Sequence, residues 1–428
     1  MSVITEEGVR SELGAWLASN FRPELALSEW RTRLADSGWG CPSWPVEWHG
    51  RGLSLALGDV VQHEFNRVGA VGIPQGPGPT LAGATLLEYA SDEQKRRFLR
   101  PIITGEDTWC QLFSEPGSGS DLAGLTTRAD LDDEGRDDSG LDDSDWVVNG
   151  QKVWTTSAHH ARYGMLLART NWDVPKHRGI TYFVIDMHQP GVVVRPLRQM
   201  NGHASFNEVF FTDARVPGAN VIGGVGNGWA VALATLAHER RMNDIRRGAG
   251  HASSARGRVY DEYRAETASV MEPYKWYPQR AGRLDLVVER AQATGRDRDP
   301  VVRQAIAKLL ILARTAEWTA RRARAARLLG RPPGPEGSLG KLAASHIARA
   351  CAEVHTLITG AAAMLARADA PLDGVITEVL ISVPAVSIAG GTDEIQRNII
   401  GERVLGLPRE PAEDIGKPFR DVPKNLAG

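Results

Sequence analysis

The chain has 428 residues, of which 42% are hydrophobic and 24% are charged, and its formal net charge is −2. This length allows two or three domains with a sizeable buried core, and the composition is ordinary for a soluble globular protein. The near-neutral charge gives no support for nucleic-acid binding, and three widely spaced cysteines argue against a disulfide framework or a zinc site.

The hydropathy of the chain favours a soluble protein of the cytoplasm. The N-terminal sequence MSVITEEGVR is acidic and has no apolar signal core, and no stretch reaches the roughly 20 apolar residues of a membrane span. We interpret the Arg-rich segment 320–331 as a solvated helix face. We therefore expect neither a membrane nor a nucleic acid as a partner, and we expect no metal.

The first domain, residues 1–107, is predicted to be helical. Leu13, Trp16 and Leu17 recur with helical spacing, and Ser91 precedes acidic residues as the start of a helix does. Residues 108–222 then change to short β-branched and aromatic runs between Gly, Pro and Asp turns, which predicts a compact β-domain, a small barrel.

Two segments differ in composition from the residues around them. Residues 130–145, within the β-domain, are acidic and bury little, so we expect a solvated hairpin loop there. Residues 268–282 contain two prolines and three aromatic residues within helical surroundings. We interpret them as a surface elaboration, with a role in shaping a substrate entrance as the alternative.

The third domain, residues 223–428, returns to helical patterning. Four of its helices should form a bundle and a fifth should close the chain. These helices are expected at residues 229–266, 300–329, 338–368, 375–386 and 393–405. The predicted fold class is therefore α+β, with an N-terminal helical domain, a middle β-barrel domain and a C-terminal four-helix bundle.

Two segments of the β-domain together predict a flavin site. In WCQLFSEPGSGSDLAGLTTRA (109–129) an apolar strand breaks into a loop of glycines and serines, where backbone amides and hydroxyls can face a pyrophosphate or a ring edge. In WVVNGQKVWTTSA (146–158) a flat apolar Trp154 is followed by hydroxyl side chains. The alternative for Trp154 taken alone is an aromatic residue of the domain core.

These residues resemble the acyl-CoA dehydrogenase family, and the resemblance covers nearly the whole chain. FSEPGSGSD is similar to the family's TEPGAGSD loop and VWTTSA to its WITNA strand. FNEVFFTDARVP resembles its exit from the β-domain, and GGTDEIQRNIIGERVLG its C-terminal GTSxIQRxII helix. The resemblance implies FAD as cofactor, an acyl-CoA thioester as substrate and an electron-transfer flavoprotein or similar acceptor.

The resemblance also implies the site residues. Ser114 and Thr156 would hydrogen-bond the flavin ring, Trp154 would lie against it and Ser120 would meet the pyrophosphate. The complete cofactor-binding set is Phe113, Ser114, Gly119, Ser120, Trp154, Thr156, Thr392 and Glu394, where Glu394 replaces a Gln that is frequent in the family. Residues implied to bind substrate are Arg240, Gly390 and Gly391.

The family reaction needs a carboxylate that faces the substrate α-carbon. Many members carry this base as the Glu before the C-terminal GT, but Gly390 stands there in this chain. The family's second solution is a Glu on the first bundle helix in an LER-like motif, and LAHER places Glu239 at that position. The alternative is a surface Glu paired with a neighbouring cation. In the family a helix-borne base accompanies branched or bulky acyl groups, which favours such a substrate.

Two departures from the family concern subunit contacts. The Arg-x-x-Phe-Gly motif, which contacts a neighbouring subunit's FAD, is absent, and residues 358–365 replace the family's Gln-rich turn. In both departures the chain resembles divergent bacterial members of the family that form α2β2 tetramers, including steroid-degrading types. A homo-oligomer is the alternative. The remaining functional alternatives are a catalytically incomplete partner subunit and a flavin monooxygenase or oxidase on the same fold.

Overall fold

The computed structural model describes residues 4–132, 145–246, 255–329, 334, 336–411 and 414–423, with the side chains of 240–246, 327, 328 and 336 left undescribed. The chain forms two compact units. Unit 1 comprises Met1–Leu197, Ser205–Pro273 and Asp414–Gly428, and unit 2 comprises Arg198–Ala204 and Tyr274–Glu413. The predicted N-terminal helices and the β-segment therefore share one unit with the first helices that follow them.

Unit 1 begins with helices, as the sequence predicts. They are α1 (Glu6–Asn20), α2 (Leu27–Ser37), α3 (Leu55–Val68), the π-helix η2 (Gly78–Ala82), α4 (Gly83–Tyr89) and α5 (Asp92–Thr104). Ser91 caps α5 in a capping box, in which its hydroxyl accepts from the Gln94 N–H and the Gln94 side chain accepts from the Ser91 N–H. The start of a helix predicted at Ser91 is confirmed.

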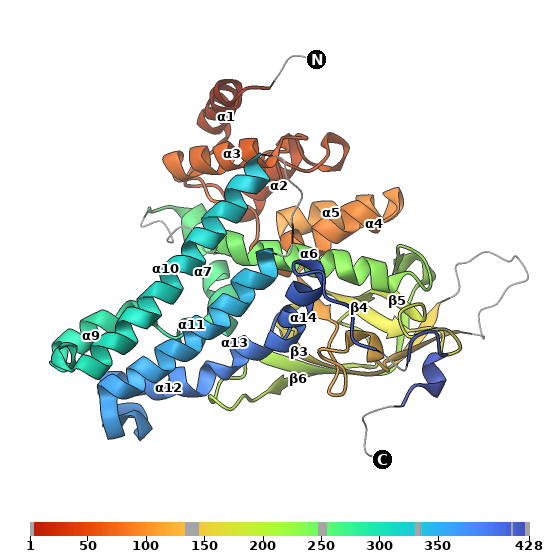
Figure 1. Cartoon of the computed structure of the whole chain (residues 1–428). Helices are drawn as coiled ribbons and strands as arrows, with labels where there is room; N and C mark the ends of the chain where they lie inside the picture. Colours follow the sequence, from red (N-terminus) through yellow and green to blue (C-terminus); the bar gives the residue numbers. More distant parts are fainter. Residues whose placement is uncertain are drawn as a thin grey trace, which may run out of the picture. The chain divides into compact units, whose positions relative to one another are not determined.

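The strands after α5 form a single mixed sheet (Figure 1). Its strands are β1 (Trp109–Leu112), β2 (Arg128–Leu131), β3 (Trp146–Thr156), β4 (Tyr163–Arg169), β5 (Ile180–Asp186), β6 (Val192–Leu197), β7 (Phe206–Val216) and β8 (Val221–Ile222). Their order is β6-β7-β3-β2-β4-β5-β8, and β1 pairs in parallel with β4. Three further strands separate β7 from β5 in this order, yet the two make contact. The sheet is therefore curled around its own core, as the barrel prediction requires.

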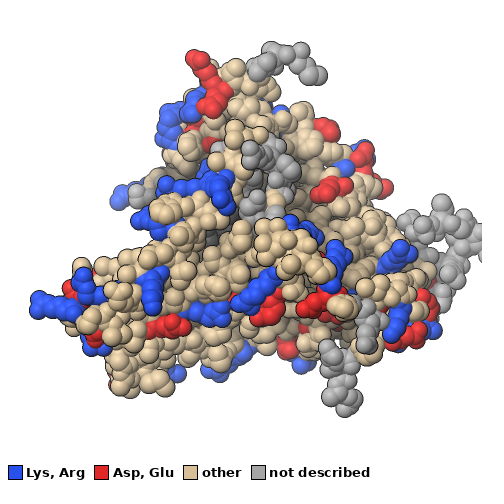
Figure 2. Space-filling model, in the orientation of Figure 1, with Lys and Arg blue, Asp and Glu red and all other residues tan. Residues whose placement is uncertain are grey.

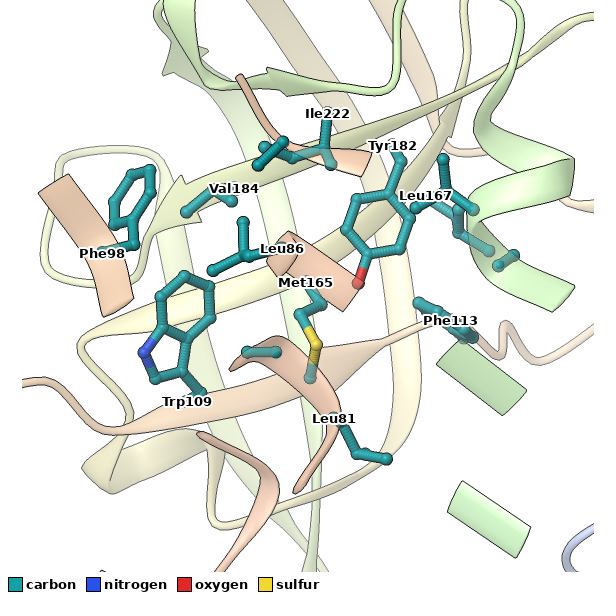
Figure 3. Packing of buried hydrophobic residues seen from close by; sticks show 14 of the residues in the cluster. Leu81, Leu86, Phe98, Trp109, Phe113, Met165, Leu167, Tyr182, Val184 and Ile222 are labelled. Carbon is teal, nitrogen blue, oxygen red and sulfur yellow. The ribbon is translucent and has the colours of Figure 1, made fainter. Parts of the chain in front are cut away.

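Alternating residues of β4 and β5 are buried on both faces of the sheet. Phe183 lies inside the curl, where its ring is 5.6 Å from that of Trp146. Tyr182 and Val184 point the other way, into a core shared with Leu86 and Phe98 of the helices (Figure 3). Because both faces are covered, these strands are almost continuously apolar instead of alternating in polarity.

Two helices of unit 1 replace the single helix expected over 229–266. They are α6 (Gly228–Arg246), which packs on β5, α4 and η2, and α7 (Arg258–Met271). Gly257, just before α7, has φ of +135°, and a Cβ there would lie 2.6 Å from Pro23 O. Only glycine fits that approach, so one uninterrupted helix was the wrong prediction.

Unit 2 is helical. Its α-helices are α8 (Tyr277–Arg280), α9 (Val287–Ala293), α10 (Pro300–Leu328), α11 (Glu336–Thr359), α12 (Val375–Ser382), α13 (Pro384–Ile388) and α14 (Asp393–Arg403). The long helices α10 and α11 pack side by side. α11 ends nine residues earlier than predicted, because Gly360 takes a φ of +65° and a 3-10 helix (Gly360–Met364) comes next.

One stretch of the described chain, Pro371–Arg403, has the length and hydropathy of a membrane span. Left-handed residues at 372–374 come directly before α12, and those at 390–391 separate α13 from α14, while Val383 separates the end of α12 from α13, which begins at Pro384. The longest of these three helices has 11 residues, whereas a spanning helix needs about 20. None of the three helices is therefore long enough to cross a bilayer by itself.

Residues 133–144 of the predicted acidic loop lie outside the described residues, but Asp132 and Asp145 are hydrogen-bonded through their backbones at its base. The Arg-rich face of α10 is exposed where it is described, as predicted, and basic and acidic side chains are interspersed on the face drawn in Figure 2. The three cysteines are free and buried.

Candidate active site

The Gly- and Ser-rich loop begins where β1 ends and is joined there to β3. The backbone N–H of Val153 donates to Ser114 O at 2.9 Å. Phe113 is buried, and its ring lies 6.0 Å from that of Tyr182. The loop and the strand exit that the sequence singled out as a flavin site are thus neighbours in space.

A buried carboxylate holds the first turn of this loop. Glu115 and Ser118 exchange two backbone hydrogen bonds of 3.1 Å, which close the turn around Pro116 and Gly117. The Glu115 carboxylate accepts from the backbone N–H groups of Thr126 and Thr127 at 2.7 and 2.9 Å. The turn is therefore tied to the chain that leads into β2.

The partner of this carboxylate is a fully buried lysine of β3. Lys152 Nζ lies 2.8 Å from Glu115 Oε1 and donates to Phe113 O at 3.0 Å. Burial alone would raise the pKa of Glu115, but Lys152 and the hydrogen bonds from Thr127 and Thr126 lower that pKa to about 2. The carboxylate is thus ionised at neutral pH, and the pair fixes both flanks of Ser114.

The tip of the loop is open. Gly119 and Ser120 are exposed, and a Cβ on Gly119 would meet nothing within 4 Å. Behind the tip, a Cβ on Gly124 would lie 2.8 Å from the side chain of Asp121. The loop therefore combines a fixed base with an accessible tip, where backbone and hydroxyl groups can receive an anionic ligand.

The end of β3 presents an aromatic side chain to the outside. Trp154 has φ of +63° and its side chain is 56% exposed, and its ring packs edge to face with that of Phe206, whose centre is 5.7 Å away. The alternative interpretation of Trp154 as a core aromatic is therefore wrong. A positive φ in a bulky residue is a strained conformation, which is typical of binding sites.

The two hydroxyl side chains beside Trp154 differ in burial. The Oγ1 atom of Thr155 is buried and has no hydrogen-bond partner among the described residues. Thr156 is half-buried and pairs with Phe206 across the sheet. An exposed indole face, the hydroxyl group of the half-buried Thr156 and free space at the loop are contacts that a tricyclic ring with a pyrophosphate tail needs.

Glu239 continues the buried stripe of α6. Val231 and Thr235 are fully buried, and Thr235 Oγ1 lies 2.9 Å from Thr85 Oγ1 of α4. Glu239 comes one helical turn after Thr235 and therefore lies on the same face, where it is half-buried. The side chain of Arg240 lies outside the described residues.

The remaining predicted residues belong to unit 2. Gly390 and Gly391 have φ of +69° and +84°, and their carbonyl groups accept from Gln396 Nε2 at 3.2 and 3.3 Å. Thr392 caps α14, with its hydroxyl 3.3 Å from Ile395 N. Glu394 is exposed and lies 3.3 Å from Arg397. The turn 390–392 is thus fixed within its own unit.

Several polar residues that organise these segments were not identified from the sequence. In unit 1 they are Glu115, Lys152, Arg169 and Lys176, and in unit 2 Asp393, which is buried and bonded to Ser345 at 2.8 Å. Of these residues, Lys152 could have been noticed in the sequence, because it is a charged residue in a predicted strand and its neighbours Val153 and Trp154 are apolar. Among the described residues, no group of His, Cys, Asp and Glu side chains is placed to hold a metal.

Comparison with known families gives matches along most of the chain. Residues 5–106 match the N-terminal domain of acyl-CoA dehydrogenase, 110–214 its middle domain and 280–405 its C-terminal domain. Acyl-CoA dehydrogenase IpdE1 of Mycobacterium tuberculosis is 35% identical over 430 residues, which cover 94% of this chain and 98% of that protein.

Solved structures show the same fold. The crystal structure of the ChsE4–ChsE5 complex from Mycobacterium tuberculosis is 27% identical, with a TM-score of 0.63 and coverage of 96% of this chain and 100% of that one. A structure described as the Tcur3481–Tcur3483 steroid ACAD is 24% identical, with a TM-score of 0.64 and coverage of 96% and 99%.

The Glu115–Lys152 pair generates a stability prediction. Glu115→Gln should lower the free energy of unfolding at pH 7 by roughly 3–5 kcal/mol, because it leaves a buried ammonium without its counter-charge. Adding Lys152→Met should restore part of this loss. Urea unfolding of wild type, both single variants and the double variant measures the effect, with the exposed Glu353→Gln as the control. A double variant no more stable than Glu115→Gln would contradict it.

The same pair predicts a pH dependence. The pKa of Glu115 is lowered from 4.5 to about 2 in the folded protein, so its contribution is present above pH 4.5 and is lost as the pH falls towards 2. The difference in unfolding free energy between wild type and Glu115→Gln should therefore shrink over this range. A difference that stays constant from pH 5 to pH 3 would show that Glu115 titrates normally.

Proposed function

The chain belongs to the acyl-CoA dehydrogenase family, and from this premise we propose that it is an FAD-dependent enzyme that oxidises the α,β-bond of an acyl-CoA thioester. The observation that carries the proposal is a single carboxylate. Glu239 lies on the inward stripe of α6, whereas the position of the alternative base is Gly390. A chain without catalytic activity would not need a carboxylate at position 239 or at position 390.

The proposed cofactor site is the surface built from the Ser114–Asp121 loop and the end of β3. Ser114 and Thr156 would bond the ring, Trp154 would cover it and Ser120 would meet the pyrophosphate. Phe113 and Gly119 would line the approach, and Thr392 and Glu394 of unit 2 are proposed as further contacts. Bound there, FAD supplies the acceptor for the substrate's β-hydrogen.

Glu239 is proposed to remove the α-proton. A carboxylate between an apolar acyl chain and a flavin loses hydration, and a less hydrated carboxylate is a stronger base. The thioester carbonyl makes the α-proton acidic, so one carboxylate suffices for this step. Arg240 is proposed to assist in substrate binding through its position in the HER motif.

We propose a branched or bulky acyl group as the substrate. A Cβ at Gly390 would meet nothing within 4 Å, so this turn leaves free volume where many relatives have a carboxylate. Gly391 adds no side chain of its own. The proposed electron acceptor is an electron-transfer flavoprotein or a similar protein, and the proposed location is the cytoplasm.

A second candidate function is that of a catalytically incomplete subunit in an α2β2 assembly. The relative ChsE4–ChsE5 is a complex of two chains, and the Arg-x-x-Phe-Gly motif is absent here. The two candidates differ in one outcome. An enzyme should bind FAD and bleach it with substrate as a purified chain, whereas a partner subunit should do so only after a second homologous chain is added.

Association with further chains is supported by exposed apolar residues of α10. Ile311 is 62% exposed and Trp318 is 60% exposed, and the two lie seven residues apart on one side of the helix. Large apolar side chains exposed together mark association sites. We propose that this side of α10 contacts a second copy of the chain.

The first functional prediction concerns the base. Glu239→Gln should keep FAD and thioester binding but slow anaerobic flavin reduction by several orders of magnitude, because only the proton acceptor is removed. The measurement is single-turnover bleaching of the flavin's visible absorbance with a panel of straight-chain, branched and polycyclic acyl-CoA thioesters.

The control for this prediction is Glu353→Gln, an exposed helix carboxylate of unit 2 that should bleach like wild type. Unimpaired bleaching in Glu239→Gln would assign the base elsewhere. A straight-chain thioester that reacts faster than every branched or polycyclic one would contradict the proposed substrate class. A colourless chain that FAD cannot reconstitute, alone or with a homologous partner, would contradict the flavin site.

The second functional prediction concerns association. Ile311→Asp combined with Trp318→Asp should shift the chain to a smaller species, because two charges would be buried in the contact. Light scattering after size exclusion measures the mass at several protein concentrations. Arg324→Asp is the matched control, since Arg324 is exposed and lies six residues from Trp318, on another side of α10. An unchanged mass in the double variant would exclude this side of α10 from the contact.

A further inference from the structure

The C-terminal segment 414–423 returns to unit 1 and docks beside β4. The backbone N–H of Phe419 donates to Val174 O at 2.9 Å, and that of Arg420 donates to Trp172 O at 3.0 Å. Phe419 is 2% exposed, whereas Ile415 nearby is 78% exposed. The segment is therefore anchored at one apolar side chain and by strand-like pairing, although most of its residues are at the surface.

The anchor contacts a guanidinium that already holds the candidate cofactor loop. Arg169 Cζ lies 3.4 Å from the centre of the Phe419 ring. The same guanidinium donates to Ala123 O at 2.6 Å and to Leu125 O at 3.1 Å, in the turn directly after the loop. Burial lowers the pKa of Arg169 to about 10, so the group is still charged at neutral pH.

A second cation repeats this arrangement. Lys176 Nζ lies 3.1 Å from Asp121, the last residue of the FSEPGSGSD loop, and 2.6 Å from Asp414 of the C-terminal segment. The hydrogen bond from Lys176 lowers the pKa of Asp414, which keeps that carboxylate ionised. Lys176 thus contacts both the C-terminal segment and the loop, and Arg169 contacts the segment and the turn that directly follows the loop.

We propose that residues 414–422 are a positioning element for the Ser114–Asp121 loop, which they hold in the conformation that receives FAD. The inference rests on the proposed flavin site. Arg169 and Lys176 are the positioning residues through which the segment acts, and no residue of the segment needs to touch the cofactor. Phe419 covers one face of the guanidinium, and Asp414 holds the Lys176 ammonium beside Asp121.

The physical basis is preorganisation. A loop with two glycines and an exposed tip has many conformations, and those that bind the pyrophosphate are a fraction of them. If loss of the segment reduces that fraction to a tenth, the affinity for FAD falls about tenfold. The contacts within the Glu115 turn are independent of the segment, so the loop base should persist without it.

The test uses the full-length apoprotein, prepared by removing FAD, and measures the dissociation constant for FAD by flavin fluorescence. Phe419→Ala should weaken FAD binding about tenfold, and Phe419→Tyr should restore the affinity because it retains the ring over Arg169. Asp414→Asn should weaken binding by a smaller factor. Ile415→Ala, an exposed neighbour in the same segment, should bind FAD like wild type.

The outcomes separate this inference from the proposed function. Wild type that binds FAD while Phe419→Ala and Asp414→Asn bind it equally well would overturn the positioning role alone. Wild type that binds no FAD, either alone or with a homologous partner chain, would overturn the flavin site and, with it, this inference. Should Phe419→Ala fail to fold, Asp414→Asn alone tests the positioning role, because it removes one half-buried charge and leaves the Phe419 anchor intact.

A spectroscopic measurement distinguishes positioning from stability alone. At saturating FAD, the visible circular dichroism of the bound flavin should differ between Phe419→Ala and wild type, because the loop sets the surroundings of the cofactor. Reduced stability with unchanged FAD affinity and an unchanged flavin spectrum would overturn the proposal.

Discussion

The buried ion pair between Glu115 and Lys152 is the interaction on which the candidate site depends. It joins the loop after β1 to the middle of β3, two segments that each supply half of the proposed flavin surface. A loop of glycines and serines has little side-chain packing to hold it. The Glu115 carboxylate restrains the base of the loop by accepting four hydrogen bonds, from Thr126 N and Oγ1, Thr127 N and Lys152 Nζ. The exposed tip is not involved in these bonds and stays available to a ligand.

Charge also restrains the far end of the loop, from the last residue of β4 and from the chain that follows this strand. Arg169 closes the turn at 122–125 through backbone carbonyl groups, and Lys176 holds the Asp121 carboxylate. The backbone carbonyl groups stabilise the charge of the buried guanidinium, and the carboxylate stabilises the charge of the ammonium. The loop is thus held at both ends by cations, and its middle alone is left free.

Much of the fold could be predicted from the sequence, and the reasons differ between elements. The cap at Ser91 and the apolar runs of β4 and β5 are local signals, and the structure contains both. The interruption between α6 and α7 was missed because the need for glycine at 257 arises from Pro23, which is distant in sequence. For the site, the motifs located the loop and the Trp154 strand exit. They could not reveal the Arg169–Phe419 contact, since 250 residues separate the two positions and no periodicity links them.

The backbone at 390 gives a physical reason why the proposed base is carried by α6 and not by the turn before α14. Gly390 has φ of +69°, a left-handed conformation that costs an L-residue with a side chain about 1 kcal/mol or more. The amide of Gln396 donates to the carbonyl groups of both glycines and so stabilises the turn in this form. A carboxylate at 390 would therefore oppose the local conformation of its own loop. On α6 the same group incurs no such cost, because Glu is a good helix former and the stripe through Val231 and Thr235 already faces inward. The proposed base, Glu239, thus lies where the backbone accepts it.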